Sequence, residues 1–267
     1  MRKLFLFLCL LAFSVASIAQ AETIQADTVK APVGGIFYKP AKKETPFSVE
    51  FGLATTNLWR GVDVGRQTCV KIETEYEPVQ WFTLSNVTAV VSNQYKIGYG
   101  NMYNTKASFN YYNVKAGLQD VYFDNNLGSP NDTDFFDFNR STTSHFVEAF
   151  FEYKGDSKSK VDFLTTYCFY QNASYTRNSW YVEATYRVAE NAKLFAGYVV
   201  GPSGVSFQNA NGFTNIGINI KRPLEFSKNF NTIANLTVSV NPSYSTVKND
   251  NPTVANRPVN VVLAVLF

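Results

Sequence analysis

The sequence is poor in the side chains that most enzyme sites require. Its 267 residues contain one histidine, His145, and three cysteines, of which Cys9 lies in the apolar run at the N-terminus. Cys69 and Cys168 are far apart in the chain and lack the spacing of a metal site or a disulfide framework. Ser144 precedes His145, but neighbouring side chains on a strand point to opposite faces, so the two cannot act together. Because the sequence also has no phosphate-binding loop or nucleophile elbow, we expect no catalytic residues, no cofactor and no metal.

Charged residues and long apolar runs are also scarce. Asp, Glu, Lys and Arg make up 17% of the chain, and Phe, Trp and Tyr make up 16%. Beyond residue 21 no stretch reaches the roughly 18–20 apolar residues that a membrane-spanning helix needs. Without the two basic residues at positions 2 and 3, the net charge is 24 − 2 − 21 = +1, which argues against a nucleic-acid partner. Few charges and many aromatic residues are typical of a strand-built surface that faces lipid.

The N-terminus predicts export from the cytoplasm. Arg2 and Lys3 precede the apolar run 4–18, and residues 19–21 (Ala-Gln-Ala) give the small-x-small pattern of a signal-peptidase site. Residues 1–21 are therefore expected to form a cleaved signal peptide. Residues 22–45 are polar, contain proline and glycine and show no periodicity, which predicts a flexible periplasmic segment. Residues 46–267 then form one domain.

From Phe47 onward, apolar and polar residues alternate with a period of two, which is the pattern of half-buried β-strands. Such runs predict twelve strands, at residues 47–54, 70–76, 80–91, 103–111, 113–123, 146–153, 161–170, 180–188, 192–200, 215–221, 234–240 and 258–267. The connections alternate between short turns and longer loops, as in bacterial membrane barrels. Aromatic residues are expected at the two rims, namely Trp59, Phe123, Tyr170 and Trp180 at the outer rim and Trp81, Tyr153 and Phe267 at the inner rim.

The final strand indicates how the sheet is closed. One face of residues 258–267 is apolar throughout, with Val259, Val261, Leu263, Val265 and Phe267 in a row. A closed barrel removes the exposed edge that such a strand would otherwise leave. At roughly 3.3 Å per residue, about ten tilted residues cross an apolar band of about 25 Å. The sequence therefore predicts an all-β fold, a closed antiparallel transmembrane β-barrel of about twelve strands.

The stretch at residues 55–62, Thr-Thr-Asn-Leu-Trp-Arg-Gly-Val, ends the first predicted strand and opens the first loop. It resembles the aromatic-Arg-Gly motif of TorF-type porins, a family of small outer-membrane barrels, and residues 114–123, 146–150 and 180–197 resemble later strands of that family. The resemblance implies a barrel in the outer membrane of a Gram-negative bacterium, with a channel role. Phe267 and Val265 resemble the C-terminal signal recognised by the barrel-assembly machinery, which would then be a partner.

Ten charged residues alternate with apolar residues in the predicted strands and are expected to face the lumen: Glu50, Lys71, Glu73, Glu75, Glu148, Glu152, Asp162, Glu183, Arg187 and Lys221. A charge on the lipid face near the midplane costs roughly 2–4 kcal/mol, so inward placement is expected. Since acidic groups outnumber basic ones in this set, they could line a weakly cation-preferring path. Alternatively, they pair across strands and fill the bore, because twelve strands lie between filled and open barrels.

Two segments at the predicted outer rim are further candidates. In the rim motif Trp59-Arg60-Gly61, Gly61 could adopt a positive φ, and Arg60 could constrict the mouth or anchor the loop through a rim carboxylate. Loop 124–142 is expected to be an external loop held to the rim by its aromatic residues, with inward folding, Ca²⁺ binding or a surface partner as alternatives. Its acidic, basic and aromatic residues are Asp132, Asp134, Phe135, Phe136, Asp137, Phe138 and Arg140.

These observations favour a channel for passive diffusion of small polar solutes or ions across the outer membrane, surrounded by lipid. The oligomeric state is left open. A non-conducting structural or interaction barrel that presents its external loops to a partner is the alternative. A lipid-modifying enzyme of the outer membrane is a distant alternative, because His145 is predicted to face lipid beside the rim.

Overall fold

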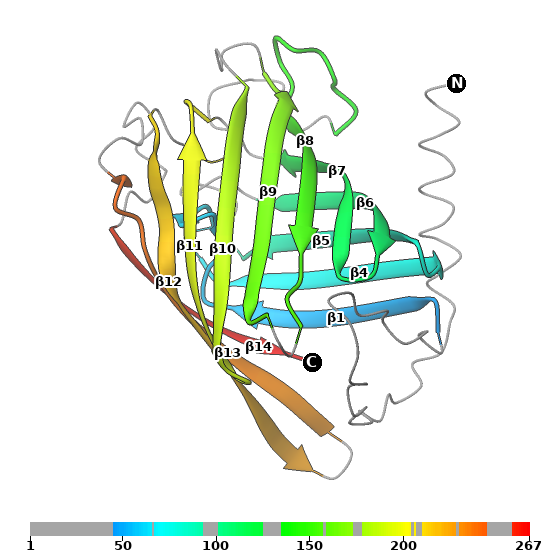
Figure 1. The fold of residues 1–267 in the computed structure, drawn as a ribbon, viewed down its shortest axis with the longest axis vertical. Helices are drawn as coiled ribbons and strands as arrows, with labels where there is room; N and C mark the ends of the chain where they lie inside the picture. The colour runs from blue at the N-terminus through cyan, green and yellow to red at the C-terminus, as the bar shows by residue number, and fades with distance from the viewer. Residues whose placement is uncertain are drawn as a thin grey trace. The chain divides into compact units, whose positions relative to one another are not determined.

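The computed structural model describes residues 45–65, 67–92, 101–124, 135–156, 159–172, 178–203, 206, 210–227, 230–244 and 258–267. Within these residues the chain forms a closed antiparallel barrel with the strand order β1-β14-β13-β12-β11-β10-β9-β8-β7-β6-β5-β4 (Figure 1). The predicted all-β fold and its closed twelve-strand ring are confirmed. The predicted signal peptide 1–21 and residues 22–44 of the predicted periplasmic segment lie outside the described residues.

The strands and their bounds are β1 (Phe47–Ala54), β2 (Leu58–Trp59), β3 (Val62–Asp63), β4 (Cys69–Val79), β5 (Phe82–Val91), β6 (Met102–Tyr111), β7 (Val114–Phe123), β8 (His145–Tyr153), β9 (Val161–Tyr170), β10 (Ser179–Ala189), β11 (Ala192–Val200), β12 (Gly212–Ser227), β13 (Phe230–Val240) and β14 (Val259–Leu266). Sequence neighbours pair throughout the ring, and β1 closes it by pairing with β14.

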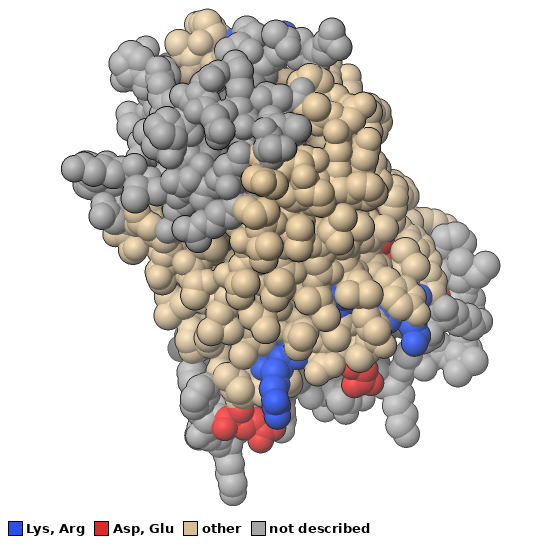
Figure 2. Space-filling model, turned by 90° about the vertical axis from the view of Figure 1, so that its left-hand side faces the viewer, with Lys and Arg blue, Asp and Glu red and all other residues tan. Residues whose placement is uncertain are grey.

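The alternation in the sequence places apolar side chains on the outside of the ring. On β14, Val261 is 60% exposed and Leu263 is 49% exposed, whereas Val262 between them is buried inside. Leu53 and Ala54 on β1 show the same contrast. Figure 2 shows the resulting outer face, on which Lys, Arg, Asp and Glu gather near the lower edge below a broad uncharged band. No helix in the described part of the chain is long and apolar enough to cross a bilayer.

Short connections define one end of the barrel, which we call the turn end. Residues 80–81, 112–113 and 190–191 each join two strands there. Tyr112 has φ 53°, the left-handed conformation that a two-residue hairpin turn requires. The opposite end, where β1 finishes at Ala54 and β14 begins at Val259, is called the loop end.

The β12–β13 hairpin differs from the prediction, which ended one strand at residue 221 and began the next at residue 234. Both strands continue through this segment, and their pairing reaches Ser227 and Phe230. Pro223 is accommodated because β11 pairs with β12 only as far as Ile220, so the backbone of Pro223 has no neighbour on that side. The hairpin therefore projects beyond the turn end, as the lower strands in Figure 1 show.

The seam between β1 and β14 is short. Its ladder contains three residue pairs, Gly52–Leu266, Leu53–Val265 and Ala54–Ala264, whereas β1 and β4 share eight. Three further backbone hydrogen bonds extend it. Phe267 donates to the Phe51 carbonyl at 2.7 Å, Phe51 donates to the Phe267 carbonyl at 3.4 Å, and Thr55 donates to the Leu263 carbonyl at 2.9 Å. The ring is thus closed by fewer backbone pairs than join β1 to β4.

Two of the predicted rim aromatics are not on the outer rim. Trp59 lies in the β2–β3 hairpin and packs against a cluster of inward-facing side chains. Phe123 belongs to that cluster and is 1% exposed. Both predictions were wrong because they considered only the nearness of an aromatic residue to a strand end and not the face on which it lies. Trp180 and Trp81 are exposed on the outside.

Candidate functional site

The residues that follow β1 form a small hairpin that enters the bore from the loop end. Strands β2 and β3 pair through Leu58–Asp63 and Trp59–Val62, which leaves Arg60 and Gly61 as the two turn residues. Both have positive φ, 48° for Arg60 and 82° for Gly61. Two residues with positive φ form a type I′ turn, whose twist matches that of the paired strands. The predicted positive φ at Gly61 is therefore observed, in a hairpin that the sequence analysis did not predict.

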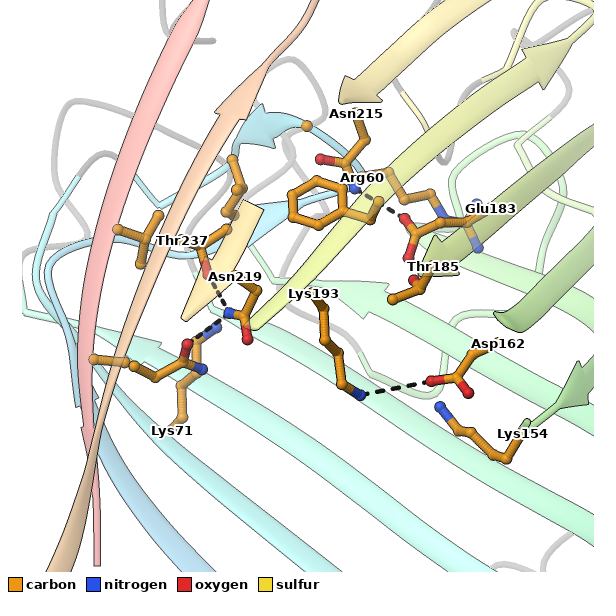
Figure 3. A pocket seen from close by; sticks show the side chains of 16 residues that line it. Arg60, Lys71, Lys154, Asp162, Glu183, Thr185, Lys193, Asn215, Asn219 and Thr237 are labelled. Atoms are coloured by element: carbon orange, nitrogen blue, oxygen red, sulfur yellow. Dashed lines mark hydrogen bonds and ion pairs between the residues drawn. The ribbon is translucent and has the colours of Figure 1, made fainter. Parts of the chain in front are cut away.

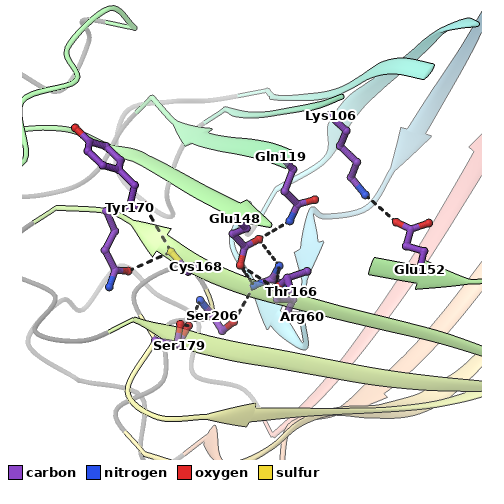
Figure 4. A network of polar contacts seen from close by, with 12 residues as sticks. Arg60, Lys106, Gln119, Glu148, Glu152, Thr166, Cys168, Tyr170, Ser179 and Ser206 are labelled. Carbon is purple, nitrogen blue, oxygen red and sulfur yellow. Dashed lines mark hydrogen bonds and ion pairs between the residues drawn. The ribbon is translucent and has the colours of Figure 1, made fainter. Parts of the chain in front are cut away.

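Arg60 makes the principal polar contact of this hairpin. Its two terminal nitrogens bond the two carboxylate oxygens of Glu148, at 2.9 and 2.5 Å (Figure 4). Arg60 also donates to the Thr166 hydroxyl at 3.1 Å and to the Ser206 hydroxyl at 3.2 Å. The Gln119 amide and the Thr166 hydroxyl donate to the same carboxylate. The motif Trp59-Arg60-Gly61 was predicted to lie at the rim, but its arginine pairs with a carboxylate on the inner wall.

The guanidinium of Arg60 is also enclosed by aromatic rings. Its central carbon lies 4.8 Å from the ring centroid of Trp59 and 4.6 Å from that of Tyr181. The side chains of the ion pair are only 6% exposed for Arg60 and 1% exposed for Glu148. A buried pair of this kind is stable when its geometry is bidentate and its remaining hydrogen-bonding groups are satisfied. The pair fixes the hairpin tip against β8.

Gly61 is held from the opposite wall. Its carbonyl accepts a hydrogen bond from the Asn260 amide at 3.1 Å and one from the Asn241 amide at 3.5 Å. A Cβ atom at this position would lie 1.7 Å from the Thr214 carbonyl oxygen. Only glycine fits here, because the backbone of the tip touches the backbone of β12 while φ is positive. The hairpin therefore extends across the bore from Glu148 on β8 to β12 and β14.

Apolar residues pack around the hairpin on both sides. Leu58 packs against a cluster that includes Ala54 and Val262. On the other side Trp59 and Val62 meet inward-facing apolar residues of β5 to β9, namely Ala89, Met102, Val121, Phe123, Phe146 and Cys168. These side chains would be out of place in a water-filled lumen. The apolar inner wall at the loop end is the surface on which the hairpin packs, so the loop-end half of the bore is occupied.

Below the hairpin the bore opens into a polar chamber of about 320 Å³ (Figure 3). Arg60 and Gly61 form its roof, and Lys154 and Lys193 lie toward the turn end. The Asn219 amide donates to Asn235 at 2.6 Å and to Thr237 at 2.7 Å, and the Asn215 amide donates to Glu183 at 2.9 Å. Lys193 pairs with Asp162 at 3.5 Å. The bore thus holds the hairpin on its loop-end side and a chamber lined by polar side chains below it.

The structure places all ten predicted lumen residues on the inner face of the ring. Glu148 pairs with Arg60, Glu152 with Lys106 at 3.3 Å and Asp162 with Arg187 at 3.4 Å. Glu75 lies 3.9 Å from Lys115. Glu50 is directly opposite Glu73, and Lys71 and Glu183 line the chamber. Lys221 is opposite Asn235, a chamber residue.

Five bases of the bore were absent from the predicted lumen set, namely Arg60, Lys106, Lys115, Lys154 and Lys193. With them, the acidic excess that suggested a cation preference is no longer present among the described inward-facing residues. Lys106 lies in a strand whose faces the alternation did not separate clearly. The Arg-Gly pair between Leu-Trp and Val-Asp was a usable signal for a two-residue hairpin.

His145 begins β8 on the outer face, as its position in the alternation predicts, but it does not contact lipid, because it is fully buried. Its Nδ1 lies 2.8 Å from an Asp120 carboxylate oxygen and its Nε2 lies 2.8 Å from the Phe135 carbonyl oxygen. The ring stacks on Phe138 at 4.2 Å and lies 4.6 Å from Tyr122. Segment 135–138 thus covers the outside of the wall at His145, whose Nε2 contacts this segment and whose Nδ1 contacts β7.

Of the candidate loop 124–142, the structure describes Asp124 and residues 135–142. Asp132 and Asp134 lie outside the described residues. Phe136 is 57% exposed on the outside, and Arg140 lies 5.7 Å from the Tyr170 ring. A side-chain hydrogen bond from Thr142 and the backbone amide of Asn139 lower the pKa of the Asp137 carboxyl. Among the described residues no group of three or more His, Cys, Asp or Glu is arranged to hold a metal ion.

The C-terminal residues Val265 and Phe267 lie on the seam between the first and last strands. Val265 is opposite Leu53, and Phe267 exchanges backbone hydrogen bonds with Phe51. Phe267 is half exposed.

No protein-family model matches the sequence. No curated protein matches it significantly either.

Proposed function

We propose that this chain is a bacterial outer-membrane barrel that admits small polar solutes or ions into a bore constricted by the β2–β3 hairpin. The observation that carries this proposal is the pairing of an apolar exposed outer face with a charged, hydrogen-bonded inner face around one closed ring. A closed ring satisfies the backbone of every strand without water, which is what the hydrocarbon region requires.

The outer face supports the membrane part of the proposal. Exposed Val, Leu, Ile and Phe side chains recur on the strands around the ring, including Phe51, Leu118, Leu194, Ile216, Leu236 and Val261. An apolar surface this extensive, if it faced water, would favour association. Surrounded by lipid it is stable. Trp81 stacks on Phe109 at the turn end, at a centroid distance of 5.9 Å and an interplanar angle of 4°, where an interfacial aromatic girdle is expected.

The inner face supports the transport part. The chamber is lined by amides, hydroxyls and charged side chains and adjoins the turn end. The hairpin above it is attached to the wall through one ion pair, several hydrogen bonds and apolar packing on both sides, and its position would decide whether the chamber connects with the loop end. We therefore describe the protein as a narrow channel with a hairpin constriction, a role that agrees with the resemblance of its aromatic-Arg-Gly motif to TorF-type porins.

Planar-bilayer recording tests this function directly. The purified chain should give small, discrete conductance steps, and a variant in which residues 58–63 are replaced by Gly and Ser should give larger ones. Equal conductance of the parent chain and the variant would mean that the hairpin does not constrict the bore. Co-fractionation with outer membranes, and heat-modifiable migration on gels, test the location independently of any current.

A second function is favoured by the burial of the Arg60–Glu148 pair. A constriction with both charges enclosed and the glycine carbonyl held by two asparagines is also what a permanently closed barrel would contain. In that case the protein would act as a structural or interaction barrel that presents loop-end segments to a partner. Absence of conductance in the chain and in the hairpin-replacement variant, with folding intact, would select this function.

A further inference from the structure

The outer face of the ring includes a polar area. On β14 the outward positions are aliphatic, and Val261 and Leu263 among them are well exposed. On β4, β5 and β6, which are neighbours in the ring (Figure 1), the outward positions instead include an asparagine and three threonines. They lie on the same faces of their strands as the exposed Tyr76, Val90 and Phe109. We name these four side chains the outer polar patch: Thr74, Asn86, Thr88 and Thr105.

The outer polar patch is continuous across the three strands. Thr74 is opposite Asn86, and Asn86 is opposite Thr105. The Asn86 amide donates to the Thr105 hydroxyl at 2.9 Å, and the Thr88 hydroxyl donates to the Asn86 amide oxygen at 2.7 Å. Asn86 is the fifth of the ten residues of β5. The patch therefore lies midway between the turn end and the loop end, at the depth where the hydrocarbon region is centred.

Part of the hydrogen-bonding capacity of the patch is not used within the described residues. Asn86 has a second N–H group and a second lone pair on its oxygen, and the Thr105 hydroxyl accepts a bond without donating one. Lipid tails offer neither donors nor acceptors, so each unused donor at this depth costs free energy. A second protein surface with matching groups removes that cost. The patch therefore indicates a protein contact inside the membrane.

The partner that fits the patch is a second copy of this chain. An amide both donates and accepts, so Asn86 complements its own counterpart. Two copies with the same orientation in the membrane are related by a two-fold axis along the membrane normal, which brings residues of equal depth together. Thr105 and Ala107 are successive outward residues of β6, and their small side chains let the two walls approach closely.

We propose that two copies of this chain associate in the membrane through the outer polar patch, with their Asn86 amides hydrogen-bonded across the two-fold axis. The exposed side chains of Tyr76, Val90 and Phe109 pack against the second copy around that centre. The proposal goes beyond the channel function, but it rests on the membrane location proposed with it. A dimer of this kind needs no conduction.

Energy transfer between full-length chains labelled at the N-terminus tests the dimer in phospholipid vesicles, as the ratio of protein to lipid is varied. The parent should dimerise in a concentration-dependent way. Asn86→Leu should raise the dissociation constant by about tenfold, which corresponds to about 1.4 kcal/mol, the scale of one side-chain hydrogen bond inside a membrane. Thr105→Val keeps the shape of the side chain, removes the hydroxyl and should also weaken the dimer. Thr165→Val is the matched control, because it removes an outward hydroxyl on β9, away from the patch, and should dimerise as the parent does.

Cross-linking locates the contact. Thr105→Cys treated with a short bismaleimide should form covalent dimers in the same vesicles. Leu236→Cys, which places a thiol on the outer face of β13, should not. The native thiols of Cys69 and Cys168 are buried, and the parent chain measures their background reaction.

A folded parent chain that stays monomeric in vesicles would overturn the proposal, and so would equal dissociation constants for Asn86→Leu and Thr165→Val. Cross-linking of Leu236→Cys in preference to Thr105→Cys, or cross-linking of Thr105→Cys in outer membranes to a different protein and not to a second copy, would overturn it as well. Heat-modifiable migration on gels checks that each variant is folded. Dimers without conductance would remove the channel function and leave the interface standing, whereas conducting monomers would give the opposite result.

Discussion

Arg60 and Glu148, 88 positions apart in the chain, face each other inside the bore with two parallel hydrogen bonds of 2.9 and 2.5 Å. Replacing Glu148 with Gln leaves the Arg60 guanidinium buried without its counter-charge. We expect this change to lower the free energy of unfolding by about 3–5 kcal/mol and to increase the conductance by loosening the hairpin. Urea unfolding in lipid vesicles and single-channel recording measure the two effects.

The matched control for this variant is Glu152→Gln, which breaks the more exposed pair with Lys106. A partly exposed pair contributes only about 0.2–1 kcal/mol. Removing both partners of the buried pair together, as Arg60→Met with Glu148→Met, should be less harmful than removing Glu148 alone. Equal losses in the Glu148 and Glu152 variants would contradict the assignment of the hairpin anchor.

Gly61→Ala should displace the hairpin tip. A Cβ atom there would lie 1.7 Å from the Thr214 carbonyl oxygen, and φ is 82°. Gly201→Ala is the control, because φ is 86° there but the nearest atom lies at 3.7 Å. We expect a larger fall in the melting temperature and a larger rise in conductance for the Gly61 variant. Similar behaviour of both variants would mean that backbone strain, and not close approach to β12, governs position 61.

Leu263→Arg tests whether the outer face lies in lipid. Leu263 is 49% exposed on the outside of β14, and an arginine facing lipid near the midplane costs roughly 2–4 kcal/mol. We expect the variant to insert into phospholipid vesicles with a correspondingly lower stability. Asn235→Arg, at a neighbouring level on the inner face, should be tolerated better. Equal insertion of the two would place the outer face outside the hydrocarbon region.

The ring itself could be predicted because its signal is local. Alternation along Phe47–Ala54 or Val259–Leu266 fixes which face each side chain takes, and an apolar outward face determines the register. The inward placement of the ten charged lumen residues follows from the same alternation. The ends of the strands could be predicted less well, since the predicted strand stopped at residue 221 and the structure continues it to Ser227.

The contents of the bore could not be derived in the same way. Parity places Glu148 inside but cannot identify Arg60 as its partner, because that contact depends on the twist of the whole ring. Phe123 was predicted to lie at the outer rim because it ends a strand. Its side chain instead points inward and belongs to the cluster against which the hairpin packs. The burial of His145 under residues 135–138 depends equally on a long-range fold-back of a loop.

The short ladder between β1 and β14 should affect how the barrel assembles and how it unfolds. Three residue pairs join the first and last strands, against eight between β1 and β4. The least protected backbone amides of the ring should therefore be those of Phe51–Ala54 and Ala264–Phe267. During biogenesis these two strands would meet last, and under heat or pulling force they would part first, so the circle opens between its first strand and its last.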